Sequence, residues 1–154
     1  MTPPLQQRWF EDYTVGESFE FGDYLITASE IVEFARRYDP QPFHVDAAAA
    51  AKSHFGGLIA SGWMTGSVLM RLVVDHFVAP SSSMGSPGLE QIRWRVPVRP
   101  GDRLSARVTV LESRASKSKP DRGSLLLRQE AINQTGEVVM SLEGWALIRR
   151  RSTA

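Results

Sequence analysis

The chain contains no cysteine. Disulfide bonds, thiolate metal sites and a cysteine nucleophile are therefore all excluded, and the composition is the one that we expect of a cytoplasmic protein. The chain also has no apolar run long enough to cross a bilayer, and residues 1–8 contain no basic segment followed by an apolar one. We therefore expect neither a membrane span nor a signal peptide.

A surplus of charge of one sign is absent as well. The 18 lysines and arginines are balanced by 17 aspartates and glutamates, which leaves a formal net charge of +1 at pH 7. Without a strong positive field we expect no nucleic-acid partner and no anionic membrane surface as a partner. The three histidines, His44, His54 and His76, follow no usual metal-ligand spacing, so we expect no metal ion either.

Length and composition indicate one ordinary globular domain. The chain has 154 residues, of which 42% are hydrophobic and 23% are charged. This is enough for one hydrophobic core and leaves little room for a second. We find no internal repeat and no low-complexity linker, so we expect a single domain across residues 1–154.

The first half of the chain predicts one strand followed by two helices. Residues 19–26 are rich in aromatic and branched side chains, which is typical of a strand, and Gly22 interrupts them as a bulge would. Thr27 and the glutamate three residues later form a capping-box pattern, which predicts a helix that ends at the next proline. Asp46 is a suitable N-cap for a second, alanine-rich helix over residues 47–52.

The middle of the chain predicts a long helix from residue 62 to about residue 79. Ser61 can cap this helix, and its side chains are apolar on nearly every face. Such a helix is normally buried in a core, so we expect Trp63 and the methionines to lie there. The alternative for Trp63 is a place in the wall of an acyl pocket.

The second half predicts antiparallel strands. From residue 104 to residue 110, apolar and polar side chains alternate, which is the pattern of a half-buried strand. We expect the other strands and connections as follows: strands over residues 89–98, 125–133 and 138–148, a turn at residues 134–137 and a polar loop at residues 112–123. A sheet that wraps one central helix buries the apolar side of both, so the predicted fold class is α+β.

Asp39 and His44 are the strongest candidates for chemistry. They stand five positions apart on a connection stiffened by Pro40 and Pro42, which favours two side chains held close to one water molecule or substrate atom. We expect Asp39 at a helix C-terminus, where partial negative charge disfavours a carboxylate, so we predict a raised pKa that suits a general acid. From the residues alone, the alternative is a turn aspartate and a solvated or core histidine.

Five segments of the chain resemble the MaoC-like dehydratases, which are relatives of the (R)-specific enoyl-CoA hydratases. They are residues 10–16, 39–44, 55–62, 93–102 and 133–138, in the order and at the spacing of the family. The resemblance implies a hotdog fold, in which an antiparallel β-sheet wraps a long central helix. It also implies an acyl-CoA thioester as the ligand and substrate, and a homodimer or larger homo-oligomer. The reaction of such a substrate with water requires no metal and no redox cofactor, so we expect none.

The resemblance assigns roles to individual residues. Asp39 and His44 match the Asp-(any four)-His motif that holds the catalytic water in the hydratases, so both are candidate catalytic residues. Ser61 stands where relatives commonly carry a histidine before the first glycine of the central helix. Ser67 lines up with a serine that helps to position the Asp–His pair in some relatives. The candidate substrate-binding residues are Ser61, Gly62, Trp63 and Ser67.

Hydration of a trans-2-enoyl-CoA to an (R)-3-hydroxyacyl-CoA, or the reverse dehydration, is the activity that the resemblance implies. His44 is a natural base near neutral pH, while Asp39 can donate a proton or hold the water, and the residues alone leave open which group takes which step. The N–H groups at the start of the central helix, around Gly62 and Trp63, can polarise the thioester carbonyl.

Two other functions fit a protein of this fold. A thioesterase generally places a working carboxylate on or near the central helix, whereas residues 62–74 contain no Asp or Glu. The second alternative is a non-catalytic protein that binds acyl-CoA or a partner protein. The presence of both Asp39 and His44 favours an enzyme over this second alternative.

Overall fold

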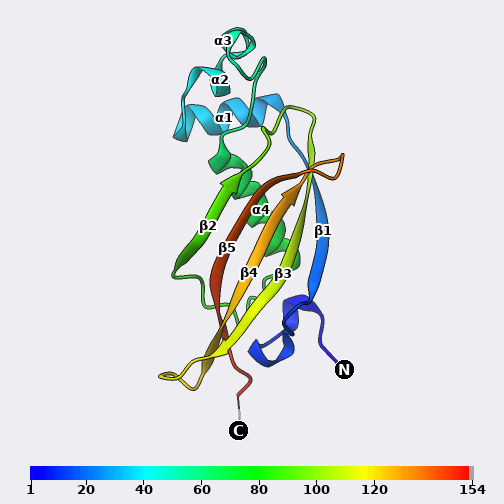
Figure 1. The fold of residues 1–154 in the computed structure, drawn as a ribbon, viewed down its shortest axis with the longest axis vertical. Coiled ribbons are helices and arrows are strands. Elements are labelled where there is room, and N and C mark those ends of the chain that lie inside the picture. The colour runs from blue at the N-terminus through cyan, green and yellow to red at the C-terminus, as the bar shows by residue number, and fades with distance from the viewer. Residues whose placement is uncertain (153–154) are drawn as a thin grey trace.

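The computed structural model describes residues 1–152, and its main element is one antiparallel sheet of five strands (Figure 1). The strands lie in the order β1-β3-β4-β5-β2, so the two strands that come first along the chain form the opposite edges. Their bounds are β1 Ser18–Leu25, β2 Gly88–Trp94, β3 Arg103–Ala115, β4 Arg122–Ile132 and β5 Val138–Arg149.

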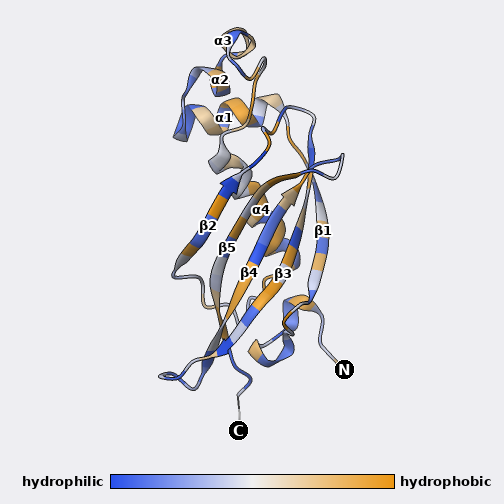
Figure 2. Ribbon diagram, in the orientation of Figure 1, coloured by the Kyte–Doolittle hydropathy of each residue, from blue (hydrophilic) through white to orange (hydrophobic). Residues whose placement is uncertain are grey.

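Burial along β3 explains why the sheet has one apolar side. Leu104, Ala106, Val108 and Val110 are buried, whereas the residues between them are half-buried. Because successive side chains of a strand point to opposite faces, these four apolar side chains lie on the same face of the sheet. Figure 2 shows the same pattern as hydrophobic and hydrophilic bands that follow one another along the central strands.

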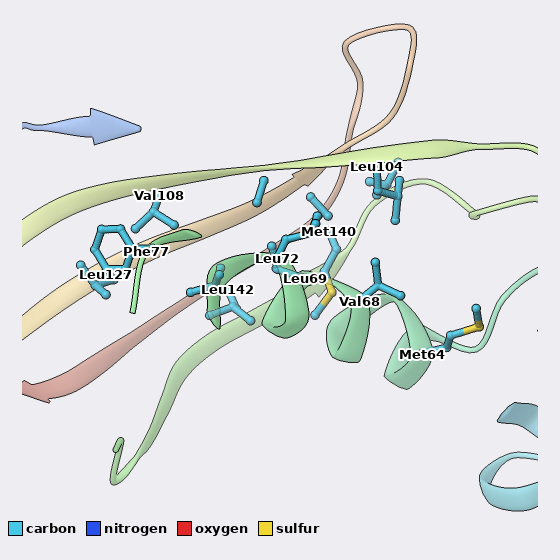
Figure 3. Close-up of a cluster of buried hydrophobic side chains, with 14 of the residues drawn as sticks. Met64, Val68, Leu69, Leu72, Phe77, Leu104, Val108, Leu127, Met140 and Leu142 are labelled. Atoms are coloured by element: carbon cyan, nitrogen blue, oxygen red, sulfur yellow. The ribbon is translucent and has the colours of Figure 1, made fainter. Parts of the chain in front are cut away.

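The long helix α4, Gly62–His76, packs across this apolar face (Figure 1). Ser61 caps the helix as predicted, because its side chain accepts a hydrogen bond from the Trp63 N–H. Figure 3 shows Val68, Leu69 and Leu72 of α4 directed toward the strands. The buried face of the helix consists of Met64, Thr65, Val68, Leu69, Leu72 and Val73.

The outer face of α4 is exposed in the single chain, so the prediction of a helix buried on nearly every side is wrong. Trp63, expected in the core, is 62% exposed, and Met70 is 52% exposed. Val74 is exposed on the same helix. The five-stranded sheet covers the helix from one side only, and this leaves apolar side chains at the surface.

Three short helices gather at one end of the sheet, beside the start of α4 (Figure 1). They are α1 Ala28–Tyr38, α2 Pro42–Val45 and α3 Ala47–Lys52. The predicted caps are confirmed, since Thr27 accepts a hydrogen bond from the Glu30 N–H and Asp46 accepts two from the N–H groups of Ala48 and Ala49. Helix α2 was not expected, although a proline at the first helical position is a recognised start signal.

The hairpin of β3 and β4 is longer than predicted. Half of the region expected as a polar loop, residues 112–123, is strand, because β3 runs to Ala115 and β4 begins at Arg122. The connection is therefore residues 116–121. The polar end of β3 is exposed, and this part of the hairpin extends beyond α4 (Figure 1). The segment is therefore polar because α4 does not cover it, although it is still part of a strand.

The complete arrangement is the α+β hotdog fold that the resemblance implies, with five antiparallel strands against one long helix. Two short 3-10 helices, η1 Leu5–Gln7 and η2 Phe10–Asp12, precede β1. The predicted bulge at Gly22 is confirmed by a register shift between Phe21 and Tyr24. Within residues 1–152, no helix has the length and apolar character needed to cross a membrane.

Leu69 provides a test of the helix–sheet layer. It is fully buried, so Leu69→Ala should lower the free energy of unfolding by about 2–5 kcal/mol through the cavity that it leaves. Arg71→Ala is the matched control on the same helix. Arg71 is exposed and paired with Asp75, so its loss should change the free energy by no more than about 0.5 kcal/mol. Urea unfolding measures both, and equal stabilities would contradict this packing.

Candidate active site

Asp39 and His44 lie in direct contact, with His44 Nε2 3.2 Å from Asp39 Oδ2. Local structure brings them together, because Asp39 is the C-cap of α1 and the chain turns almost at once into α2. In that turn the His44 N–H donates to the Gln41 carbonyl at 2.9 Å, which directs the histidine back toward the aspartate. The two side chains thus meet through the single turn of α2.

The His44 ring is held in one tautomer. The residue is 4% exposed, and Nδ1 lies 2.7 Å from the Ile59 carbonyl oxygen. A carbonyl oxygen only accepts hydrogen bonds, so Nδ1 must carry a proton. The other nitrogen, Nε2, is therefore the atom that gains or loses a proton, and it faces Asp39.

The carbonyl that orients His44 is fixed by its backbone neighbours. The Ile59 N–H donates to the Phe43 carbonyl at 3.2 Å, and the Ala60 N–H donates to the Val98 carbonyl at 2.8 Å. The loop before α4 is thereby attached both to α2 and to the segment that follows β2. The direction of Nε2 consequently depends on the backbone of three separate parts of the chain.

Three side chains act on the Asp39 carboxylate. Gln41 Nε2 donates to Oδ1 at 2.7 Å and Ser61 Oγ donates to Oδ2 at 2.8 Å, while His44 also faces Oδ2. Burial works to raise the pKa of Asp39, but the hydrogen bonds from Gln41 and Ser61, together with His44, hold this pKa below its ordinary value. The raised pKa expected for Asp39 at a helix C-terminus is therefore wrong, because direct donors to the charged form outweigh burial.

The contact between Asp39 and His44 requires one shared proton. When Asp39 is ionised, Nε2 makes a favourable contact with Oδ2 only if Nε2 carries a proton. When His44 is neutral, the proton must lie on the carboxyl group instead. In both states one proton lies between the two atoms, so the pair can accept a proton at one group and release one from the other.

The N-terminus of α4 lies beside the pair. Ser61 is fully buried, and its oxygen accepts a hydrogen bond from the Trp63 N–H at 3.3 Å. The Trp63 N–H is therefore engaged within the protein. Gly62 is the first residue of the helix, where an N–H has no intrahelical acceptor. Of the two donors expected to polarise a thioester carbonyl, the Gly62 N–H is the one left available.

A pocket of about 360 Å³ adjoins these groups. Its walls include Asp39 and His44, Gly62 and Trp63 at the start of α4, and residues 94–98, which begin with the last residue of β2. The Trp63 and Trp94 rings stand edge to face with centroids 5.2 Å apart, and both are exposed. The pocket thus combines a polar end at the Asp–His pair with an aromatic wall, which suits a ligand with a reactive polar group and an apolar part.

Ser67 lies apart from this pocket. Its hydroxyl donates to the Trp63 carbonyl at 2.7 Å, and it lines a different groove together with Met70 and Leu89. Among the residues expected at the site, the structure brings together Asp39, His44, Ser61, Gly62 and Trp63. It does not bring Ser67 to them.

Two further residues contribute to the site without having been expected there. Gln41 stands inside the Asp-(any four)-His motif and donates to Asp39, but a glutamine in a short connection is ordinarily solvated and gives no signal. Ile59 contributes only its backbone carbonyl. Because every residue carries such a carbonyl, no side-chain pattern could have identified it.

The other two histidines are engaged elsewhere. The His54 ring lies 3.9 Å from the Phe55 ring, and the His76 ring lies 5.3 Å from the Phe21 ring, measured between centroids. In the part of the chain that the structure describes, no group of three or more His, Cys, Asp or Glu residues could hold a metal ion.

Two glycines of α4 test the close contact at the start of the helix. A Cβ added at Gly62 would lie 2.6 Å from the Trp94 ring, whose N–H donates to the Gly62 carbonyl at 2.8 Å. Gly62→Ala should therefore displace the tryptophan and lower the free energy of unfolding by about 1–3 kcal/mol. Urea unfolding and tryptophan fluorescence measure the two effects.

Gly66→Ala is the matched control. A Cβ at Gly66 would lie 3.2 Å from the flexible end of Met140, which can move aside. Alanine also favours the helix over glycine, so this variant should be unchanged or more stable by up to about 1 kcal/mol. Equal stabilities and equal fluorescence in the two variants would contradict the tight contact between Gly62 and Trp94.

The chain is similar to known proteins over most of its length. The family model described as MaoC like domain matches residues 11–126. The solved structure of a MaoC-like dehydratase from Rhodospirillum rubrum is 40% identical, with a TM-score of 0.88 over 94% of this chain and 99% of that one. The YdeM protein of Bacillus subtilis is 28% identical over 140 residues, which are 91% of this chain and 98% of YdeM.

A relative whose name states an activity is the 3-hydroxybutyryl-CoA dehydratase of Methylorubrum extorquens. It is 32% identical over 113 residues, which are 73% of this chain and 69% of that protein. Two further relatives are longer, and this chain spans only 30% and 43% of their length. Since the family model covers most of the sequence and includes both Asp39 and His44, the chain belongs to the MaoC-like dehydratase family.

Proposed function

We propose that the protein is a hydro-lyase that adds water to a trans-2-enoyl-CoA to give an (R)-3-hydroxyacyl-CoA, or catalyses the reverse dehydration. The observation that carries the proposal is the 3.2 Å contact between His44 Nε2 and Asp39 Oδ2 in the wall of a pocket. The similarity to a 3-hydroxybutyryl-CoA dehydratase supports the same reaction class. The (R) configuration is taken from the resemblance to the (R)-specific hydratases.

The first step is the attack of water on Cβ of the enoyl group. The lowered pKa of Asp39 keeps this group a carboxylate at neutral pH, which makes it the proton acceptor of the pair and not the general acid. As the water oxygen forms its bond to Cβ, one water proton passes to Asp39. The electron pair of the double bond moves toward Cα and the thioester carbonyl.

The second step is protonation of Cα by His44. The proton on Nε2 forms the new C–H bond, and the electron pair that had moved toward the carbonyl makes that bond. Asp39 then holds one proton more and His44 one proton fewer. A transfer between the two groups, which lie 3.2 Å apart, restores the starting state, so hydration neither consumes nor releases a proton.

Negative charge on the thioester oxygen requires a donor, and the Gly62 N–H is suited to this role. It is the first N–H of α4, in the pocket wall, where the helix dipole also favours negative charge. One preorganised donor of this kind typically stabilises the transition state by about 3 kcal/mol. Hydration by this route uses no metal ion and no redox cofactor.

The thioesterase alternative lacks a carboxylate in the expected place. Among the described residues that line the pocket, Asp39 is the only carboxylate. The acid on α4 is Asp75, near the opposite end of the helix, where it pairs with Arg71 at 2.9 Å. The geometry therefore favours proton transfer to and from carbon over hydrolysis of the thioester.

Removal of either member of the pair tests the proposal. Asp39→Asn and His44→Ala should each lower kcat for hydration of crotonyl-CoA by about 10²-fold or more, because the first removes the proton acceptor and the second the donor. Loss of the conjugated double bond, followed by absorbance, measures the rate. Chiral analysis of the product measures its configuration.

Matched controls are Asp46→Asn and His54→Ala, which make the same changes outside the pocket. Asp46 caps α3, a role that asparagine also fills, and His54 is exposed. Both controls should keep near wild-type rates. Normal turnover in the Asp39 or His44 variant would overturn the assignment of the catalytic pair. Release of free thiol from acyl-CoA by the wild type would indicate a thioesterase. Binding of acyl-CoA without turnover would indicate a non-catalytic protein.

We also propose that the protein is a homodimer. Large apolar side chains are exposed on α4 and on the neighbouring strand β2: Trp63, Met70, Val74, Leu89 and Trp94. Met70 and Leu89 line a groove of about 370 Å³ between these elements. A second copy seated on this surface would cover the outer face of α4, which one sheet leaves exposed.

Light scattering tests the dimer. The wild type should have twice the mass of the chain, and Met70→Glu should shift the equilibrium to the monomer by placing a charge in the apolar surface. Leu25→Glu is the matched control, because Leu25 is an exposed leucine on β1 at the opposite edge of the sheet. A monomeric wild type, or a Met70→Glu variant as dimeric as the control, would contradict the proposed surface.

A further inference from the structure

We propose that Ser61 is a positioning residue for the Asp39–His44 pair, whose hydroxyl connects the N-terminus of α4 to the Asp39 carboxylate and holds that group as the proton acceptor. The inference rests on the proposed hydration for its catalytic consequence. It departs from the role expected of Ser61, which was direct contact with the substrate.

Burial argues against contact between Ser61 and a substrate. The residue is 0% exposed, and it is absent from the described residues that line the pocket, although Ala60 and Gly62 on either side of it are present. Its side chain therefore lies behind the pocket wall. From this place it reaches Asp39 Oδ2, at 2.8 Å from Oγ.

The direction of the hydrogen bonds is determined by the groups involved. The Trp63 N–H can only donate, so Ser61 Oγ accepts from it at 3.3 Å. A hydroxyl has one proton, and Asp39 Oδ2 is the acceptor within reach. The hydroxyl thus accepts from the helix N-terminus and donates to the carboxylate, and both bonds favour the ionised form of Asp39.

The groups that contact the Asp39 carboxylate come from three parts of the chain. Gln41 precedes α2, His44 lies on α2, and Ser61 caps α4. Arg95 lines the same pocket, but its guanidinium donates to Ser141 Oγ at 3.3 Å. The side chains of Gln41 and Ser61 do not ionise, so their hydrogen bonds to the Asp39 carboxylate do not depend on a proton that either residue gains or loses.

The loss of the Ser61 hydroxyl should have a defined kinetic signature. Asp39 would lose one of its donors, so its titration should move to higher pH, and the acidic limb of kcat/KM should move with it. We expect kcat to fall about 10- to 100-fold, the range for one hydrogen bond to a charged group. KM should stay within about threefold, because Ser61 does not touch the substrate.

Ser61→Gly is the preferred variant. Glycine at an N-cap weakens a helix less than alanine does, so this change removes the hydroxyl while the helix keeps its start. Ser61→Ala is the second variant, and it shows whether an effect comes from loss of the hydroxyl or from the backbone flexibility of glycine. Thr27→Ala is the control, since it removes an equivalent cap from α1 at a residue that does not contact the pair.

Two measurements decide the proposal. The first is the midpoint of the Asp39 carboxyl titration, followed by carbon-13 NMR and assigned with Asp39→Asn. The second is the pH profile of crotonyl-CoA hydration. Both Ser61 variants should raise the midpoint and shift the acidic limb upward, whereas Thr27→Ala should leave both at the wild-type values.

An unchanged midpoint of the Asp39 titration in the Ser61 variants would overturn the inference. A rise in KM with kcat and the pH profile unchanged would also overturn it, because this result would indicate that Ser61 contacts the substrate. Failure of the proposed function looks different. In that case the wild type would not hydrate the enoyl thioester, while the NMR titration would still show whether Ser61 acts on Asp39.

Discussion

The hydrogen bond between His44 Nδ1 and the Ile59 carbonyl is the interaction on which the site depends. A neutral imidazole can present either nitrogen as the acceptor, and this bond removes the choice by requiring a proton on Nδ1. Nε2 is then the exchanging atom, and it faces Asp39. Because the anchor is a backbone carbonyl attached to α2 and to the segment after β2, the chemistry of the pair is specified by the fold itself.

The start of α4 serves the site in three ways, because a helix N-terminus offers N–H groups without intrahelical partners. The Trp63 N–H acts indirectly, through Ser61, on Asp39. The Gly62 N–H remains available in the pocket wall, and the Gly62 carbonyl holds the Trp94 ring. These contacts involve consecutive residues of one backbone. A shift of this turn would therefore disturb the proposed proton acceptor, the proposed hydrogen-bond donor to the thioester carbonyl and the aromatic wall together.

Local patterns predicted most of the fold and part of the site. The caps at Thr27, Asp46 and Ser61 and the alternation along β3 were predictable because each depends on residues close in sequence. The low pKa of Asp39 was not, because one of its donors arrives from a residue 22 positions away. The exposed outer face of α4 was also missed. An apolar pattern predicts that a helix face will be buried, but it does not show whether the same chain or another chain buries it.

Trp63 links the site to the surface proposed for the dimer, since it lines the pocket and also belongs to the exposed apolar face of α4. A second copy over this face would exclude water from the aromatic side of the pocket. The lower local dielectric constant would strengthen hydrogen bonds and would raise the free energy of a charge that lacks hydrogen-bond partners. Asp39 would face that penalty directly. The hydrogen bonds from Gln41, Ser61 and His44 lower the pKa of Asp39 in the single chain. In the proposed dimer the same hydrogen bonds would offset the penalty and keep Asp39 ionised.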